Sequence, residues 1–192
     1  MPLLKVGHMY KRFTLASGNK VILRVLRWED LDRLLSFINS LVKEKRGDSR
    51  SGLYTGFDKT ITREEEAEWL AQTLVEIERG EVINTIAEIG GKIIANGEVT
   101  RGKYKDTRHH GHMGLTMINE YRGQGIGRRI IETLVQESRT AGLGTLEVEF
   151  LAVNETARRA YEKAGFNQAG IIPRKVFRGG KYFDGLIMFR EL

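Results

Sequence analysis

The sequence contains no cysteine, only two prolines and no long apolar run. Without cysteine, the chain can form neither disulfide bonds nor thiolate metal sites. No apolar stretch approaches the roughly 20 residues that a membrane-spanning helix needs, and the start of the chain lacks the apolar segment of a secretory signal. We therefore expect a cytoplasmic protein with no membrane partner. Since no proline- or serine-rich linker divides the chain, we expect residues 1–192 to form a single domain.

The net charge of +6 at pH 7 is the next compositional feature. A polyanionic ligand would suit this charge, but so would an ordinary solvated surface with a modest excess of lysine and arginine. The basic residues are scattered among acidic ones rather than clustered with aromatic residues, and no nucleic-acid-binding motif is present. We therefore expect no nucleic-acid partner.

Hydrophobic periodicity and turn residues predict the order of helices and strands. Strands are expected at 21–26, 82–89, 92–100, 110–118, 145–151, 170–176 and 181–189, and helices at 31–42, 62–77, 126–141 and 154–165. Residues 47–58 contain several glycines and serines and are expected to form a loop. The order predicts an α/β (α+β) protein with a single mixed sheet and helices on both faces.

A glycine-rich segment, Arg122-Gly123-Gln124-Gly125-Ile126-Gly127, lies between an expected strand and an amphipathic helix. Glycines let a backbone approach a ligand closely, and the first N–H groups of a helix attract phosphate. The segment is not a Walker loop, because Arg128 and Arg129 follow where lysine and serine or threonine would stand. Nor is it a dinucleotide fingerprint, which needs glycine or alanine in place of Arg128. A flexible connection without a ligand is the alternative interpretation.

The pattern Arg/Gln-x-x-Gly-x-Gly/Ala resembles the pyrophosphate loop of the GNAT superfamily of N-acetyltransferases. A second signature, Asn154-x-x-Ala157-x-x-x-Tyr161-x-Lys163-x-Gly165-Phe166, is similar to the end of that family's coenzyme A site. The two signatures stand in the family's order, and the resemblance covers about residues 20–190. It implies the GNAT fold, in which the single mixed sheet is mostly antiparallel.

The resemblance implies that the chain binds acetyl-CoA and needs no metal. The strand before the loop would diverge from its neighbour, and its backbone groups at Leu115, Thr116 and Met117 would bond the pantetheine amides. Asn154 would reach the pantetheine arm. The pyrophosphate would be held by Arg122, Gly123, Gln124, Gly125, Ile126, Gly127 and Arg128. Alternatively, Leu115 and Met117 are simply core residues, and Asn154 is simply a helix N-cap.

The resemblance also implies catalytic roles. The tyrosine that matches Tyr161 protonates the departing thiolate, and Glu149 stands where some members that acetylate protein N-termini carry a catalytic glutamate. Tyr161 could instead be a core aromatic, and Glu149 a solvated or paired acid on a sheet face. Glu98 and His112 are rival bases on neighbouring expected strands. The histidines at 109, 110 and 112 form only a weak metal pattern.

Taken together, these features predict an N-acetyltransferase that moves the acetyl group of acetyl-CoA to a primary amine. Since cysteine is absent, an acyl-cysteine relay is excluded and direct attack in a ternary complex is expected. Residues 173–184 resemble the tail of members that act on amino acids, polyamines or antibiotics, so we expect a small-molecule acceptor. The alternatives are a protein N-terminal or lysine acetyltransferase and a non-catalytic CoA-binding module. A homodimer is an alternative to a monomer.

Overall fold

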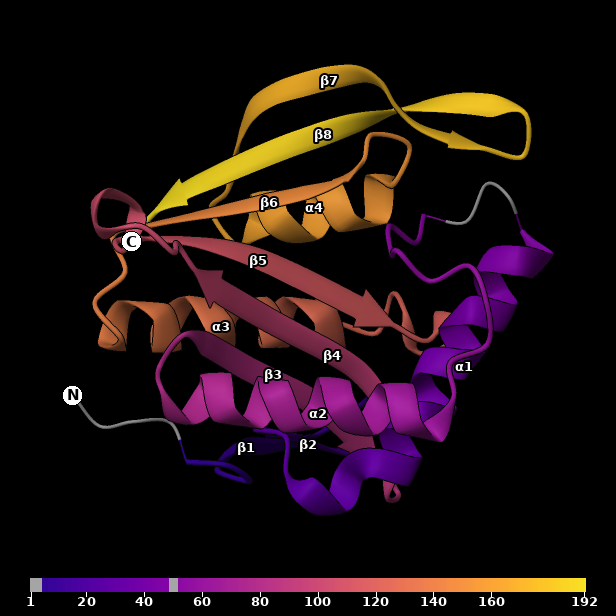
Figure 1. Ribbon diagram of the computed structural model, residues 1–192, viewed down its shortest axis with the longest axis vertical. Helices are drawn as coiled ribbons and strands as arrows, with labels where there is room; N and C mark the ends of the chain where they lie inside the picture. The colour runs from indigo at the N-terminus through magenta and orange to yellow at the C-terminus, as the bar shows by residue number, and fades with distance from the viewer. Residues whose placement is uncertain (1–4, 49–51) are drawn as a thin grey trace.

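The computed structural model describes residues 5–48 and 52–192 (Figure 1). The helices are α1 (Leu31–Gly47), α2 (Arg63–Glu78), α3 (Ile126–Thr140) and α4 (Glu155–Lys163). The strands are β1 (Met9–Thr14), β2 (Lys20–Arg24), β3 (Val82–Ile89), β4 (Lys92–Arg101), β5 (His110–Met117), β6 (Thr145–Leu151), β7 (Asn167–Arg178) and β8 (Lys181–Glu191). Short 3-10 helices connect some of them: η1 (Trp28–Asp30), η2 (Lys105–Thr107) and η3 (Asn119–Tyr121). None of the helices in this part of the chain is long and apolar enough to cross a membrane.

The strands form one eight-stranded sheet in the order β1-β2-β3-β4-β5-β6-β8-β7. Every neighbouring pair is antiparallel except β5 and β6, which run parallel. The prediction of a mixed, mostly antiparallel sheet is therefore confirmed. The helix α3 makes the crossover between the two parallel strands, as parallel pairing requires.

Helices cover both faces of the sheet, as expected. On one face, Ile130 and Leu134 of α3 pack on the central strands, and Tyr161 of α4 joins the same cluster. On the other face, α1 and α2 pack through residues such as Leu34 and Leu70. Figure 1 shows α1 and α2 beside β3 and β4, and the hairpin of β7 and β8 as the outermost part of the sheet.

Local signals in the sequence account for most element boundaries. The Thr62 hydroxyl accepts a hydrogen bond from the Glu65 N–H at 3.2 Å, and the Glu65 carboxylate accepts one from the Thr62 N–H at 2.9 Å. This capping box begins α2. Gly90 and Gly91 have φ angles of 56° and 82°, which is the backbone that a tight hairpin turn needs. These signals are local, and the tertiary structure preserves them.

Three elements differ clearly from the sequence prediction: α1, β1 and β7. Helix α1 continues to Gly47, five residues beyond the expected end at residue 42, because residues 43–47 have no apolar side chain to extend the hydrophobic period. Strand β1 was not predicted, because MYKRFT alternates poorly and lies exposed at the edge of the sheet. Strand β7 begins three residues earlier than expected and passes through Pro173. This residue lies between Ile172 and Val176, where the ladder with β8 is irregular, and an edge strand tolerates proline at such a bulge. The expected loop at 47–58 begins after α1 ends at Gly47, and residues 49–51 lie outside the described part of the chain.

Candidate active site

The site begins where β5 and β6 part. Their parallel ladder runs from His110–Thr145 to Met113–Val148 and has no further pair, although the structure describes both strands to their ends. Beyond this fork the β6-facing backbone groups of β5 have no strand partner, and backbone polar groups seek one. The expected divergence is confirmed. An extended ligand can complete the sheet here as an added strand does.

A cleft of about 1430 Å³ passes through this opening. Because side chains alternate along a strand, residues of β5 reach it on both faces of the sheet. Met113 and Met117 belong to the core beneath α3, so His112 and Thr116 face the side of α1 and α2. We call the two parts of the cleft the α3–α4 side and the α1–α2 side.

On the α3–α4 side, the glycine loop presents the N-terminus of α3. Gly125 is the N-cap residue, with φ of 79°, and Gly123 has φ of 75°. A Cβ atom at either position would meet no other atom within 4 Å, so the space above the loop is open. The first N–H groups of α3 have no intrahelical acceptor, and the helix dipole adds partial positive charge. The arrangement suits a phosphate group.

Arg122 lies in the same loop, but its side chain is already engaged. The guanidinium donates to the Glu44 carboxylate of α1 at 2.7 Å and to the Met117 carbonyl at the end of β5 at 2.6 Å. These contacts tie the end of β5 and the start of the loop to α1. Arg122 therefore fixes the loop in place, and it is the loop backbone that faces the cleft.

Of the other side chains in the loop, some are engaged with the rest of the protein and one lines the cleft. Ile126 is fully buried in the core, and Gln124 donates to the Glu120 carbonyl at 2.9 Å, so only their backbones are free to meet a ligand. Arg128 lines the cleft and is 58% exposed, paired with Glu132 one helical turn along at 2.8 Å. Such an exposed pair is weak and yields readily to a phosphate.

The three β5 residues expected at the pantetheine arm also present backbone rather than side chains. Met117 is buried beneath α3, and Leu115 packs against the same cluster. The Thr116 hydroxyl donates to the Asn96 carbonyl of β4 at 3.4 Å. The core reading of Leu115 and Met117 is thus correct for their side chains, and it is compatible with backbone hydrogen bonds to a ligand.

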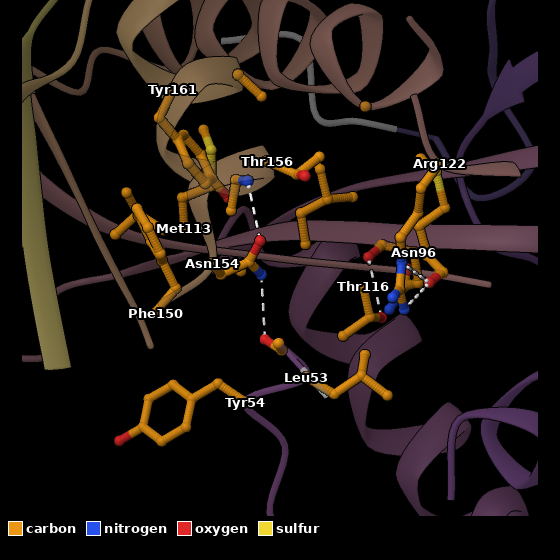
Figure 2. A pocket seen from close by; sticks show the side chains of 18 of the residues that line it. Leu53, Tyr54, Asn96, Met113, Thr116, Arg122, Phe150, Asn154, Thr156 and Tyr161 are labelled. Carbon is orange, nitrogen blue, oxygen red and sulfur yellow. Dashed lines mark hydrogen bonds between the residues drawn. The ribbon is translucent and has the colours of Figure 1, made fainter. Parts of the chain in front are cut away.

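Asn154 is the N-cap of α4. Its Oδ1 accepts from the Ala157 N–H at 3.0 Å, as an N-cap residue should. Its Nδ2 donates to the Gly52 carbonyl at 3.1 Å, across 102 residues of sequence (Figure 2). A Cβ on Gly52 would lie 2.6 Å from that nitrogen, so the loop needs glycine for this approach. The contact brings the segment from Gly52 to Phe57 to the mouth of the cleft.

Tyr161 lines the α3–α4 side and is 4% exposed. Its ring stacks on Phe150 of β6, with centroids 5.5 Å apart, and meets Phe166 edge-on at 5.3 Å. Burial raises the pKa of its phenol well above the ordinary value, because the charged form loses solvation. The hydroxyl is therefore neutral at pH 7 and has a proton to donate, although the raised pKa makes it a weaker acid than an exposed phenol.

Two carboxylates flank the fork on the α1–α2 side. Glu149 follows Val148, the last residue of β6 that pairs with β5. Glu98 of β4 pairs with Gly114, the first residue of β5 beyond the β5–β6 ladder. The Glu149 carboxylate accepts from the Tyr54 hydroxyl at 3.3 Å and pairs with Lys175 of β7 at 3.3 Å.

Glu98 has a different environment. Burial, and to a smaller extent the charge of Glu76, raise the pKa of its carboxyl above the ordinary value. The two carboxylates at the fork thus differ in surroundings: burial raises the pKa of the Glu98 carboxyl, whereas the Glu149 carboxylate is paired with the Lys175 ammonium group.

A third carboxylate, Glu66 of α2, lines the same side and was not singled out in the sequence. It is 5% exposed, and within residues 5–48 and 52–192 no side chain or backbone group bonds to its carboxylate. Burial alone raises the pKa of this carboxyl to about 7. In the sequence Glu66 is one of three consecutive acids, 64–66, in the first turn of the helix. Its helical spacing to the buried Leu70 and Thr73 nevertheless indicates that it lies on the buried face.

Two of the three histidines lie beside one carboxylate, that of Glu147. His112 lines the cleft, and its Nδ1 lies 3.5 Å from Glu147, while Nε2 of His110 is 4.0 Å from the same carboxylate. In the described part of the chain, no group of three metal-ligating side chains is arranged around a common point.

Residues 47–166, more than half of the chain, match the model of the acetyltransferase (GNAT) family. Over 52 residues the chain is 42% identical to the [ribosomal protein bS18]-alanine N-acetyltransferase of Escherichia coli (strain K12), which covers 27% of this chain and 35% of that protein. The chain thus matches only about a third of the length of its curated relatives, 38% and 35% for the first two.

Solved structures resemble the whole chain. An acetyltransferase of GNAT family from Streptococcus pneumoniae superposes with a TM-score of 0.77 at 22% identity, covering 90% of this chain and 99% of that one. A GNAT superfamily phosphinothricin acetyltransferase from Sinorhizobium meliloti, solved in complex with AcCoA, gives 0.75 at 20% identity, covering 90% and 88%. At these identities the likeness concerns the fold, and it agrees with the sheet described above.

The buried Glu66 predicts a pH-dependent stability. Its folded pKa of about 7 exceeds the ordinary 4.5 of an unfolded chain, so the folded state holds a proton that the unfolded state has released between these values. The wild type should lose stability as the pH rises from 4.5 to 7. Glu66→Gln cannot ionise and should be more stable than wild type by about 1–3 kcal/mol at pH 8, with the gap closing by pH 4.5. Denaturant unfolding across this range measures the gap, and a constant gap would contradict the burial of the charge.

Proposed function

Because this chain belongs to the acetyltransferase (GNAT) family, we propose that it transfers the acetyl group of acetyl-CoA to a primary amine. The observation that carries the proposal is the fork between β5 and β6, which leads directly into the glycine loop at the start of α3. A strand edge without a partner and a phosphate-binding helix end stand in the order that an acyl-pantetheine with a pyrophosphate tail requires.

The residues on the α3–α4 side fit acetyl-CoA. The freed backbone of Leu115 to Met117 would bond the pantetheine amides, and the N–H groups from Gly123 to Arg128 would hold the pyrophosphate. Arg128, Arg159 and Lys163 line this side and supply positive charge for the phosphates. Asn154 would orient the pantetheine arm from the start of α4 while it caps that helix.

Tyr161 is proposed as the general acid. Bound acetyl-CoA supplies a thioester carbonyl, which a neutral amine attacks with loss of the thiolate. Tyr161 would give its proton to the departing sulfur, because its phenol is neutral at pH 7 and can donate when negative charge develops on the sulfur. The packing of its ring between Phe150 and Phe166 limits rotation, which holds the hydroxyl in one place.

The amine arrives as an ammonium ion and must lose a proton before attack. Glu149, favoured by its position in the sequence, and Glu98 both flank the fork and both stay in the proposed site. Because Glu98 is desolvated and Glu149 is paired with Lys175, we assign Glu98 to accept the proton and Glu149 to draw the ammonium group to the thioester. Either carboxylate can act through one bridging water.

A protein N-terminus is the second candidate acceptor. It is favoured by the 42% identical stretch shared with an enzyme named for ribosomal protein bS18-alanine. On the α1–α2 side the cleft is open at the loop from Gly52 to Phe57, where a peptide could enter.

We expect acetyl-CoA and CoA to stabilise the folded protein. At about 100 times Kd, a ligand that binds only the folded state adds roughly 2.7 kcal/mol to the free energy of unfolding. Gly125→Glu should abolish the stabilisation, because it brings a side chain and a negative charge to the phosphate cradle. Gly18→Glu is the matched control: Gly18 also has a positive φ of 84° and open space around it, but it lies in the β1–β2 turn. Thermal melting with and without ligand decides, and an equal shift in all three proteins would remove the loop from the site.

We expect the purified protein to release CoA thiol from acetyl-CoA only when a primary amine is supplied. Tyr161→Phe keeps the aromatic packing and should lower kcat by about 10²–10⁴-fold while leaving CoA affinity nearly unchanged. Thiol release and CoA titration measure the two effects. Binding without turnover of any amine would instead indicate a CoA-binding module, and full turnover by the variant would exclude Tyr161 as the acid.

The pH dependence should distinguish the two carboxylates at the fork. Glu98→Gln should depress kcat/KM most at low pH and recover partly at high pH, where the free amine is abundant and needs no base. Glu149→Gln should raise KM for the amine and leave the shape of the pH profile as in wild type. Profiles of both variants, recorded on protein with a normal melting curve, test the assignment. The opposite pair of profiles would make Glu149 the base.

A further inference from the structure

The charged side chains that line the described cleft are sorted by side. The cations come from the loop before α3 and from α3 and α4, next to the proposed phosphate site: Arg122, Arg128, Arg159 and Lys163. Arg122 is paired with Glu44, and Glu155 at the start of α4 also lines the cleft, so the excess of positive charge there comes from the other three cations. The α1–α2 side carries the carboxylates of Glu66, Glu98 and Glu149 and, within the described residues, no lining lysine or arginine. The positively charged side and the negatively charged side of the cleft adjoin at the fork between β5 and β6. The thioester of acetyl-CoA would lie at this fork.

From this sorting we infer that the acceptor is a linear polyamine and that Glu66 is the residue that selects it by receiving a second ammonium group. The inference rests on the proposed function. Glu98 and Glu149 flank the fork and are the residues proposed to deprotonate and attract the reacting amine. Glu66 lines the cleft from α2, in the helical layer that covers the sheet. An acceptor with a second, distant cation can engage both places at once.

The state of Glu66 supports this role. The residue is 5% exposed, and no hydrogen bond or ion pair from the rest of the described chain reaches its carboxylate, which is costly for a charged group. Burial raises its pKa to about 7, so at neutral pH the carboxyl is ionised only in part. An ammonium group placed beside it would supply the missing partner and favour the ionised form. A side chain that destabilises the free protein and is stabilised by a bound ligand is typical of a binding site.

The walls between the carboxylates suit the rest of such a molecule. Leu34 and Phe37 of α1 and Trp69 of α2 line the same side, and Leu34 and Phe37 are almost fully buried. Apolar walls accept a methylene chain, and an aromatic face attracts a cation. An amino acid acceptor fits less well, because its carboxylate would enter a space lined by three acids.

A matched amine panel tests the inference. Putrescine, cadaverine and spermidine are compared with butylamine and pentylamine, which have the same chain length and one cation. Alanine, phosphinothricin and a short peptide that begins with alanine complete the panel. We expect kcat/KM for the polyamines to exceed that of the length-matched monoamines by about 10- to 100-fold, the usual worth of a charged hydrogen bond.

Glu66→Gln should reduce the ratio of kcat/KM for putrescine over butylamine towards one, through KM rather than kcat. Glu68→Gln removes the same charge from the exposed face of the same helix and should keep the wild-type ratio. A ratio near one in the wild type, a preference for an amino acid or the peptide, or an equal ratio in both variants would overturn the inference while the proposed function stands. Acetylation of no amine, together with no stabilisation by CoA, would instead overturn the proposed function.

Discussion

The parting of two parallel strands is the constraint on which the rest of this structure depends. Strands β5 and β6 pair for four residues and then diverge, which frees one edge of β5 inside the sheet. Several contacts maintain the divergence. Arg122 donates hydrogen bonds to the last carbonyl of β5 and to the Glu44 carboxylate of α1. The ring of Phe150 of β6 stacks on that of Tyr161 of α4. A sheet with regular pairing throughout would have no place for an acyl-pantetheine and no path from one face to the other.

The fork also sorts the chemistry. Because side chains alternate along β4, β5 and β6, the acids at the fork face α1 and α2, while the residues beneath α3 and α4 are apolar and the helix ends there are cationic. A polyanionic cosubstrate and a cationic acceptor would therefore approach from opposite faces without competing. The burial of Glu66 and Glu98 lowers the free energy of unfolding. Buried acids that destabilise the fold in this way are typical of sites where a bound ligand compensates the charge.

The α1–α2 side of the cleft is assembled from segments that are distant in sequence. Tyr54 and Lys175 meet at Glu149, and Asn154 holds the Gly52 carbonyl, so a loop after α1, the strand β7 and the start of α4 converge on β6. The segment from Gly52 to Phe57 has no secondary structure of its own, and these contacts position it. A helix cap and a sheet acid thereby become parts of one site.

Local chemistry in the sequence was sufficient to determine the helices and most strands, the glycine loop at the start of α3, the cap at Asn154 and the family, since each depends on neighbours within a few residues. The exposed strand β1 escaped because an edge strand has little hydrophobic pattern. Only the tertiary structure decided that Arg122 is an anchor, that Glu149 is compensated by Lys175, and that Glu66 is a buried acid in the cleft. The physical reason is that pairing and desolvation arise when residues far apart in the chain are packed together, and they change what a given side chain can do.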